Sequence, residues 1–119
     1  MVGLDNANLI EVQRYRLNQV VPAAALPQLE PQLTAVVRRL AAQSKGTMTA
    51  GPTAIHLGAL PGYAYRVAVR NTQDIPVQSR IVFAFRGRGE YLVNCQHAAG
   101  RAQAVDRACA LAVRTFRAN

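Results

Sequence analysis

Between residues 60 and 95, apolar side chains alternate with small or basic ones at a spacing of two residues. A period of two is that of a β-strand, in which successive side chains point to opposite faces. A polar turn at 71–76 and the sequence RGRG at 86–89 divide this run into three strands with short connections. Strands joined so closely pair antiparallel, and RGRG predicts a tight hairpin. An antiparallel sheet is therefore the central element of the predicted fold.

Two further strands are predicted on the N-terminal side of this run. Residues 8–17 predict a strand whose apolar phase slips near Gln13 and Arg14, which is typical of a β-bulge. Residues 47–52 are mostly small and predict a connection, and residues 53–57 predict a short strand that follows it.

Helical periodicity appears in two segments. Prolines at positions 22, 27 and 31 predict a loop or a short helical turn, because they cannot all lie inside one helix. A helix is then expected from about Pro31, with its C-terminal end near Lys45 and a cap at Gly46. Residues 98–116 carry the strongest helical pattern, with an apolar stripe of Ala102, Val105, Cys109, Ala112, Val113 and Phe116. The element order predicts a single α+β domain over 1–119, mainly antiparallel sheet packed with two main helices.

The charge balance of the chain is strongly basic. Thirteen arginines and one lysine stand against six acidic residues, which gives a formal net charge of +8. Such an excess makes nucleic acid, an anionic lipid surface or an acidic protein a candidate partner. The strand pattern separates aromatic from basic side chains, whereas an RNA-binding sheet interleaves them, which argues against nucleic acid. We expect a candidate anion-binding surface made of Arg66, Arg70, Arg80 and Arg86.

Both cysteines lie where the predicted strand and helix should face each other. Cys95 shares its strand parity with Tyr91 and Val93, and Cys109 belongs to the apolar stripe of the helix. Such positions can reach the Cα separation of roughly 4.4–6.8 Å that a disulfide needs. A disulfide is the interpretation that we favour, and it would indicate an oxidising compartment. Two reduced thiols in the core are the alternative.

His97 adds two chemical interpretations to this segment. Cys95, His97 and Cys109 could hold a metal ion, since residues two apart share one strand face. No Cys-x-x-Cys motif or evident fourth ligand accompanies them, although structural zinc sites use four ligands. A nucleophile and base formed by Cys95 and His97 would lack a residue that orients the histidine. We expect His97 at the surface and predict no metal, cofactor or catalytic residue, with a small metal-binding or thiol-dependent protein as the alternative function.

A resemblance to a known family is carried by four segments of the chain. LPGYAYRV at 60–67, IVFAFRGRGEYLVNCQ at 81–96 and DRACALAVRTFR at 106–117 resemble a family of actinobacterial cell-envelope proteins, many of them predicted lipoproteins. EVQRYRLN at 11–18 resembles the first strand of that family, so the resemblance covers most of the chain. The fold of the family is similar to that of the PsbP extrinsic proteins of photosystem II. The resemblance therefore implies a PsbP-like α/β/α sandwich.

The same resemblance implies a disulfide between Cys95 and Cys109 and export to the cell envelope. Proteins of this shape are mostly binding or accessory modules, so we expect a non-enzymatic domain whose partner is an unknown protein or envelope ligand. Residues 1–9 lack the basic and apolar regions of a signal peptide, and no lipobox cysteine is present. The expected location is the envelope or the extracellular space for the mature part of an exported protein, and the cytoplasm if Met1 is the true start.

Overall fold

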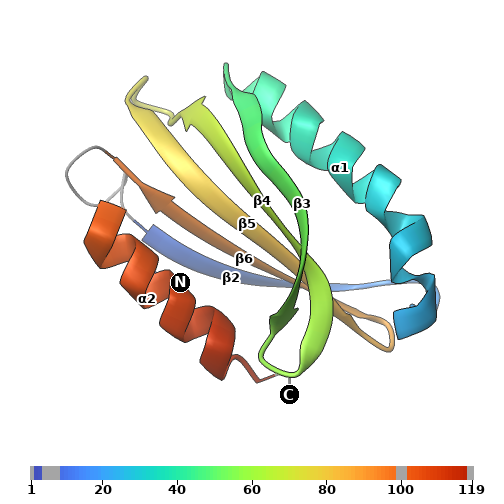
Figure 1. Ribbon diagram of the computed structural model, residues 1–119. Coiled ribbons are helices and arrows are strands. Elements are labelled where there is room, and N and C mark those ends of the chain that lie inside the picture. The colour runs from blue at the N-terminus through green and yellow to red at the C-terminus, as the bar shows by residue number, and fades with distance from the viewer. Residues whose placement is uncertain (1, 4–8, 99–101, 118–119) are drawn as a thin grey trace.

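The computed structural model of the protein describes residues 2–3, 9–98 and 102–117, and it has an α+β fold. In these described residues, six strands form one antiparallel sheet in the order β1-β2-β6-β5-β4-β3, as Figure 1 shows for its main strands. The elements are β1 (Val2–Gly3), β2 (Leu9–Arg16), a 3₁₀ turn (Ala23–Ala25), α1 (Leu26–Gln43), β3 (Thr47–Leu57), β4 (Leu60–Arg70), β5 (Pro76–Arg86), β6 (Gly89–His97) and α2 (Ala102–Thr115).

The two helices cover opposite faces of the sheet (Figure 1). On β5, Ile81, Phe83 and Phe85 pack in the core beneath α1, whereas Val82 and Ala84 pack in the core beneath α2. All five of these consecutive residues are buried, so β5 is covered on both sides. The predicted α/β/α sandwich is therefore confirmed.

The β5–β6 hairpin decides which side chains share the α2 face. Its two-residue turn, with Gly87 at a φ of 57°, brings Arg86 opposite Gly89. This register pairs Ala84 with Tyr91, so odd-numbered residues of β6 face the same way as even-numbered residues of β5. Tyr91, Val93 and Cys95 consequently lie beneath α2, on the face opposite Tyr65 and Phe83. The predicted hairpin is confirmed. The buried aromatic residues lie in two different cores, with Tyr91 beneath α2 and Tyr65, Phe83 and Phe85 beneath α1.

The predicted bulge in the first strand is wrong. Between Leu9 and Arg16, every residue of β2 pairs with a successive residue of β6 without a register shift. The apolar pattern breaks for another reason, because Val12 and Tyr15 are each 48% exposed and lie on opposite faces. Residue 8, the predicted start of this strand, lies outside the described residues.

Helix α1 begins at Leu26, five residues before the predicted start at Pro31. Pro27 lies in the first turn, where a backbone N–H has no partner within the helix and its loss costs little. Pro31 lies inside the helix and removes one backbone hydrogen bond. The helix continues through it because Leu26, on the N-terminal side, is buried against the same core as Leu33. Packing at Leu26 therefore overrides the local preference of Pro31.

The C-terminal end of α1 is a Schellman motif in which Lys45, not Gly46, takes the left-handed conformation. Lys45 has a φ of 57° and donates its N–H to the carbonyl of Ala42, while Gly46 donates to the carbonyl of Ala41. Gly46 is needed for a different reason, since a Cβ at this position would lie 1.9 Å from the carbonyl oxygen of Ala68. The predicted cap is thus wrong by one residue, because the glycine allows a close approach to β4.

Strand β3 spans Thr47–Leu57, so the predicted connection at 47–52 is also part of a strand. Its pairing with β4 shifts register between Met48 and Ala50 and again between Ala50 and Thr53. β3 is an edge strand, and an edge strand tolerates proline and bulges because one side of its backbone pairs with no other strand. The small residues of this segment therefore remain in the sheet with an irregular register.

A polar contact ties α1 to the centre of the sheet. The Thr34 hydroxyl donates to the Glu30 carboxylate at 2.6 Å and lies 3.0 Å from the hydroxyl of Tyr65. Tyr65 is only 1% exposed, and burial is the main cause that raises the pKa of its hydroxyl. The hydrogen bond to Thr34 therefore satisfies a polar group that would otherwise be costly to bury.

Helix α2 is fastened to the sheet by the disulfide between Cys95 on β6 and Cys109, whose Cα atoms are 5.9 Å apart. Val105, Cys109 and Val113 of its apolar stripe are buried, and Ala112 and Phe116 pack against the same core, as predicted. Residues 99–101, in the predicted first turn, lie outside the described residues. The favoured disulfide is therefore confirmed, and it joins the helix to the strand beneath it.

Removing this disulfide should lower the free energy of unfolding by roughly 3 kcal/mol, because the link across 14 residues restricts the unfolded chain. Urea unfolding of the Cys95→Ala/Cys109→Ala variant, compared with oxidised wild type, measures this loss. Wild-type protein in a reducing agent is the matched control and should lose a similar amount without any change of side-chain volume. A loss below about 1 kcal/mol in both samples would contradict a stabilising role.

Candidate functional site

The disulfide occupies both sulfur atoms of the predicted chemical cluster. Cys95 and His97 share the α2 face, but a metal or nucleophile site that uses Cys95 and Cys109 would require their reduction. Within 2–3, 9–98 and 102–117, no group of three or more histidine, cysteine, aspartate or glutamate side chains is placed to hold a metal ion. The oxidised protein therefore does not present the thiolates that the alternative function needs.

His97 is buried, with 9% of its surface exposed, so its expected surface position is wrong. It is the last residue of β6, and the alternation of the strand continues to its end, which turns the ring toward the α2 face opposite Gln78. Its Nδ1 atom lies 3.4 Å from the carbonyl oxygen of Ala98. The register of β6, rather than its proximity to the strand end, determines this burial.

The four arginines of the predicted anion-binding surface belong to the α2 face but occupy three separate places. Arg66 and Arg80 are direct cross-strand partners on β4 and β5. Arg70 lies four residues along β4, roughly 13 Å away, and Arg86 lies six residues along β5, roughly 20 Å away. They therefore do not form one continuous site.

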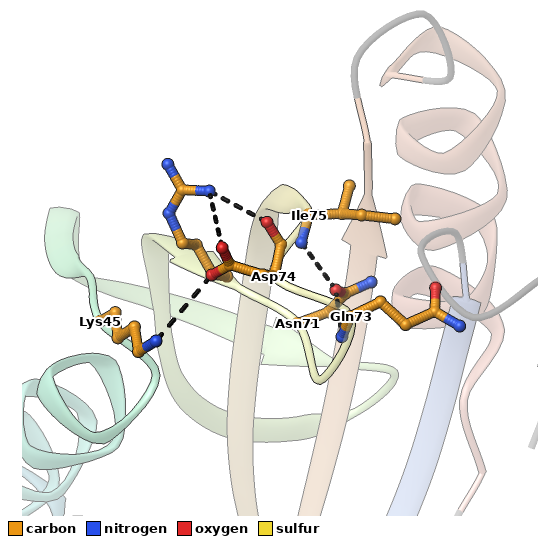
Figure 2. Close-up of polar contacts among 6 residues, drawn as sticks. Lys45, Asn71, Gln73, Asp74 and Ile75 are labelled. Atoms are coloured by element: carbon orange, nitrogen blue, oxygen red, sulfur yellow. Dashed lines mark hydrogen bonds and ion pairs between the residues drawn. The ribbon is translucent and has the colours of Figure 1, made fainter.

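Arg70 belongs to the β4–β5 turn. Its Nη1 atom donates to the carbonyl oxygen of Asp74 at 3.0 Å and lies 3.9 Å from the Asp74 carboxylate. Figure 2 shows Lys45 on the other side of the same carboxylate, at 4.0 Å. Within the turn, the Asn71 side-chain oxygen accepts hydrogen bonds from the backbone N–H groups of Gln73 and Ile75 (Figure 2). Arg70 therefore supports the turn, and we remove it from the candidate surface.

Arg66 and Arg80 line a hollow of about 310 Å³ between β3, β4 and β5. Burial lowers the pKa of Arg80, the neighbouring Arg66 lowers it further, and the Asp106 carboxylate acts in the opposite direction. Two like charges placed directly opposite each other on antiparallel strands destabilise a sheet. This pair is therefore an unfavourable arrangement for the folded protein alone.

Arg86 belongs to a second and larger group at the opposite end of the strands from the β4–β5 turn. Two neighbouring hollows of about 590 and 240 Å³ share Arg86 in their lining. No acidic residue is among the described residues that line either hollow. We call this region the basic end, and its arginines are Arg14, Arg16, Arg86, Arg88, Arg114 and Arg117.

Three elements bring the basic end together. Strand β2 contributes Arg14, whose guanidinium carbon lies 5.7 Å from the ring centroid of Tyr91, within range of a cation–π interaction. The end of α2 is held against the β3–β4 turn, where Gly58 donates its N–H to the carbonyl of Val113 at 2.6 Å. Figure 1 shows this turn, the end of α2 and the β5–β6 hairpin at the same end of the molecule.

Sequence reasoning identified only Arg86 among these six arginines. The others come from segments as distant in sequence as Arg14 and Arg117, and Arg14 reaches Tyr91 only because β2 pairs with β6. One signal was available in the sequence, since RGRG places Arg88 in the same tight hairpin as Arg86. The contributions of β2 and α2 required knowledge of the strand order.

Glu90 follows this hairpin but lies on the opposite face of the sheet. It pairs with Tyr15 on β2 and with Phe85 on β5, both of which lie on the α1 face. Burial raises the pKa of its carboxyl group. The acid adjacent in sequence to the basic end therefore points away from the α2 face.

Comparisons of the chain with protein families, curated proteins and solved structures found no match. The resemblance to actinobacterial envelope proteins accordingly stays an expectation. In the part of the chain that the structure describes, no helix is both long and apolar enough to cross a membrane.

The Glu90→Gln variant should be more stable than wild type at pH 7 and equally stable well below pH 4.5. A raised folded-state pKa means that Glu90 contributes stability below the ordinary carboxyl pKa, and that this contribution is lost as the pH rises through the raised value. The amide cannot ionise, so the variant should lose this pH dependence. Urea unfolding at pH 3 and pH 7 measures both effects.

Glu11→Gln provides the matched control, because Glu11 lies on neighbouring β2 on the same face and its replacement removes the same charge. If Glu90→Gln were no more stable than Glu11→Gln at pH 7, the cost of burying the ionised Glu90 carboxylate would be disproved.

Proposed function

We propose that this chain is a non-enzymatic binding or accessory domain of the actinobacterial cell envelope, and that its basic end binds an anionic lipid surface. The envelope location rests on the resemblance of 60–67, 81–96 and 106–117 to that protein family. The binding role rests on one observation, the convergence of six arginines around two neighbouring hollows whose described lining contains no acidic residue.

The fold gives the basic end a fixed shape. Arg114 lies on α2, which the disulfide joins to β6, and Arg86 and Arg88 flank the glycine of the tight hairpin. The backbone N–H of Leu17 also donates to the carbonyl of Arg88 at 2.7 Å, which joins the end of β2 to this hairpin. Charged groups on rigid elements lose less conformational entropy on binding than groups on mobile loops. The arrangement suits a partner that presents many negative charges at one surface.

An anionic bilayer fits this end better than a nucleic acid. Single-stranded nucleic acid binding needs exposed aromatic faces on which bases can stack. Tyr91 at the basic end is buried, and its ring packs edge-on against Phe116 with centroids 5.3 Å apart. Of the described aromatic residues that line the two hollows, Tyr15 alone is exposed, and one ring cannot stack successive bases. Arginine near an anionic membrane surface contributes about 1 kcal/mol per side chain through charge attraction, without base stacking.

The covalent state of the cysteines supports a binding role over a thiol-dependent one. The thiolates of Cys95 and Cys109 would be the strongest nucleophiles of the chain. The two residues are instead joined by the disulfide between β6 and α2. Both are almost fully buried, so substrate could not reach either sulfur without opening the core. The exposed arginines, in contrast, are accessible to a partner.

Cosedimentation with vesicles of phosphatidylglycerol and phosphatidylcholine tests this function. Wild type should bind the anionic vesicles, should not bind pure phosphatidylcholine, and should lose affinity as salt is raised. The Arg88→Gln/Arg114→Gln variant should bind roughly thirtyfold more weakly, from about 1 kcal/mol for each arginine.

Arg38→Gln/Arg39→Gln is the matched control, because it removes the same charge from exposed positions on α1, away from the basic end. It should bind almost as wild type does. Equal losses in the two variants would show an effect of net charge alone and would contradict the assignment. Tighter binding to duplex DNA than to anionic vesicles at the same salt would also contradict it.

A further inference from the structure

The hollow beside Arg66 and Arg80 is separate from the basic end. Arg80 lies six residues from Arg86 along β5, which corresponds to roughly 20 Å of extended strand. Its lining comes from β3, β4 and β5 and includes neither α2 nor the β5–β6 hairpin. A ligand in this hollow would therefore not contact the arginines of the basic end.

The edge strand is shaped around this hollow. β3 loses its regular register between Met48 and Thr53, and this stretch contains Gly51 at a φ of 105°. A Cβ at Gly51 would lie 2.7 Å from the carbonyl oxygen of Ala64, so the β3 backbone approaches β4 closely here. Bulges are common beside binding sites, where they change the direction of the strand. The other β3 residues that line the hollow are Ala50, Thr53 and Ile55, whose side chains are uncharged.

Among the residues that the structure describes, the arginine pair at this hollow has no acidic partner within ion-pair distance. The ion pairs found among residues 2–3, 9–98 and 102–117 involve Lys45 and Arg70 with Asp74, and neither includes Arg66 or Arg80. Asp106 on α2 influences Arg80 only through its charge. Arg80 is partly buried, whereas Arg66 is exposed.

We propose that Arg66 and Arg80 together bind a phosphate group in this hollow. Directly opposed residues of antiparallel strands have Cβ atoms about 5 Å apart, so two guanidinium groups can converge on one anion. A guanidinium presents paired N–H donors that match the oxygens of phosphate, and a doubly charged anion offsets both positive charges. The ligand is free phosphate or a phosphomonoester, which share this chemistry.

Thermal unfolding and isothermal titration calorimetry with inorganic phosphate test the site at constant ionic strength. Phosphate should raise the midpoint temperature of thermal unfolding of the wild-type protein, whereas chloride at the same ionic strength should not. Arg66→Gln and Arg80→Gln should each weaken phosphate binding about tenfold or more, since each removes hydrogen bonds to a charged ligand. Arg38→Gln, from the outer surface of α1, should bind phosphate as wild type does.

The stability of each variant in the absence of phosphate shows whether a substitution removes the binding site or instead destabilises the fold. Arg66→Gln removes one of two opposed positive charges at an exposed position, so it should be at least as stable as wild type in the absence of phosphate. This variant is therefore expected to be stable yet unresponsive to phosphate. Equal stabilisation of wild type, Arg66→Gln and Arg80→Gln by phosphate would overturn the proposal.

A second ligand distinguishes a phosphomonoester from free phosphate, and a second variant shows which of the two arginine sites binds phosphate. Stronger binding of glycerol phosphate than of inorganic phosphate would identify a phosphomonoester, and equal binding would identify the free ion. The Arg88→Gln/Arg114→Gln variant should keep the phosphate response of wild type. If that variant lost the response while Arg66→Gln kept it, phosphate would bind at the basic end. That result would disprove the Arg66 site and leave the proposed function unaffected.

Discussion

The register of the β5–β6 hairpin is the constraint on which the other features of this protein depend. Arg86 pairs with Gly89 across a two-residue turn, and each later pair then follows along the strands. A shift of one residue would exchange the two faces of β6 and turn Cys95 away from Cys109. The disulfide and the burial of His97 on the α2 face both follow from this register. Turn geometry, core packing and the covalent link therefore favour the same arrangement.

This arrangement also explains where the arginines lie. The α2 face takes the even-numbered residues of β4 and β5, so Arg66, Arg80 and Arg86 share it with the buried Ala64 and Val82. Helix α2 covers the apolar part of that face, and the arginines are left toward the edge strand and at the end of the strands. Two separate basic regions therefore remain beside this helix, the hollow at Arg66 and Arg80 and the basic end. We therefore propose two distinct anion sites rather than one broad basic surface.

The parts of the fold that could be predicted are those governed by local periodicity. Alternation located β4, β5 and β6, and the stripe through Val105, Cys109 and Val113 located α2, because each pattern directly reflects burial. The start of α1 and the conformation of Lys45 could not be read, since packing at Leu26 and the close approach of Gly46 to β4 decided them. The basic end required the pairing of β2 with β6, which joins residues about 80 positions apart.

The central claim is that the α2 face carries two separate sites for anions, and residue-specific NMR tests it most directly. Assigned ¹H–¹⁵N spectra of the intact protein would be recorded with inorganic phosphate and, separately, with nanodiscs of phosphatidylglycerol. We expect phosphate to shift the amide signals of Arg66, Arg80 and adjacent β3, and nanodiscs to broaden those of 86–89 and 114–117. If both ligands perturbed the same residues, or if the changes fell on the outer surface of α1, the account would be contradicted.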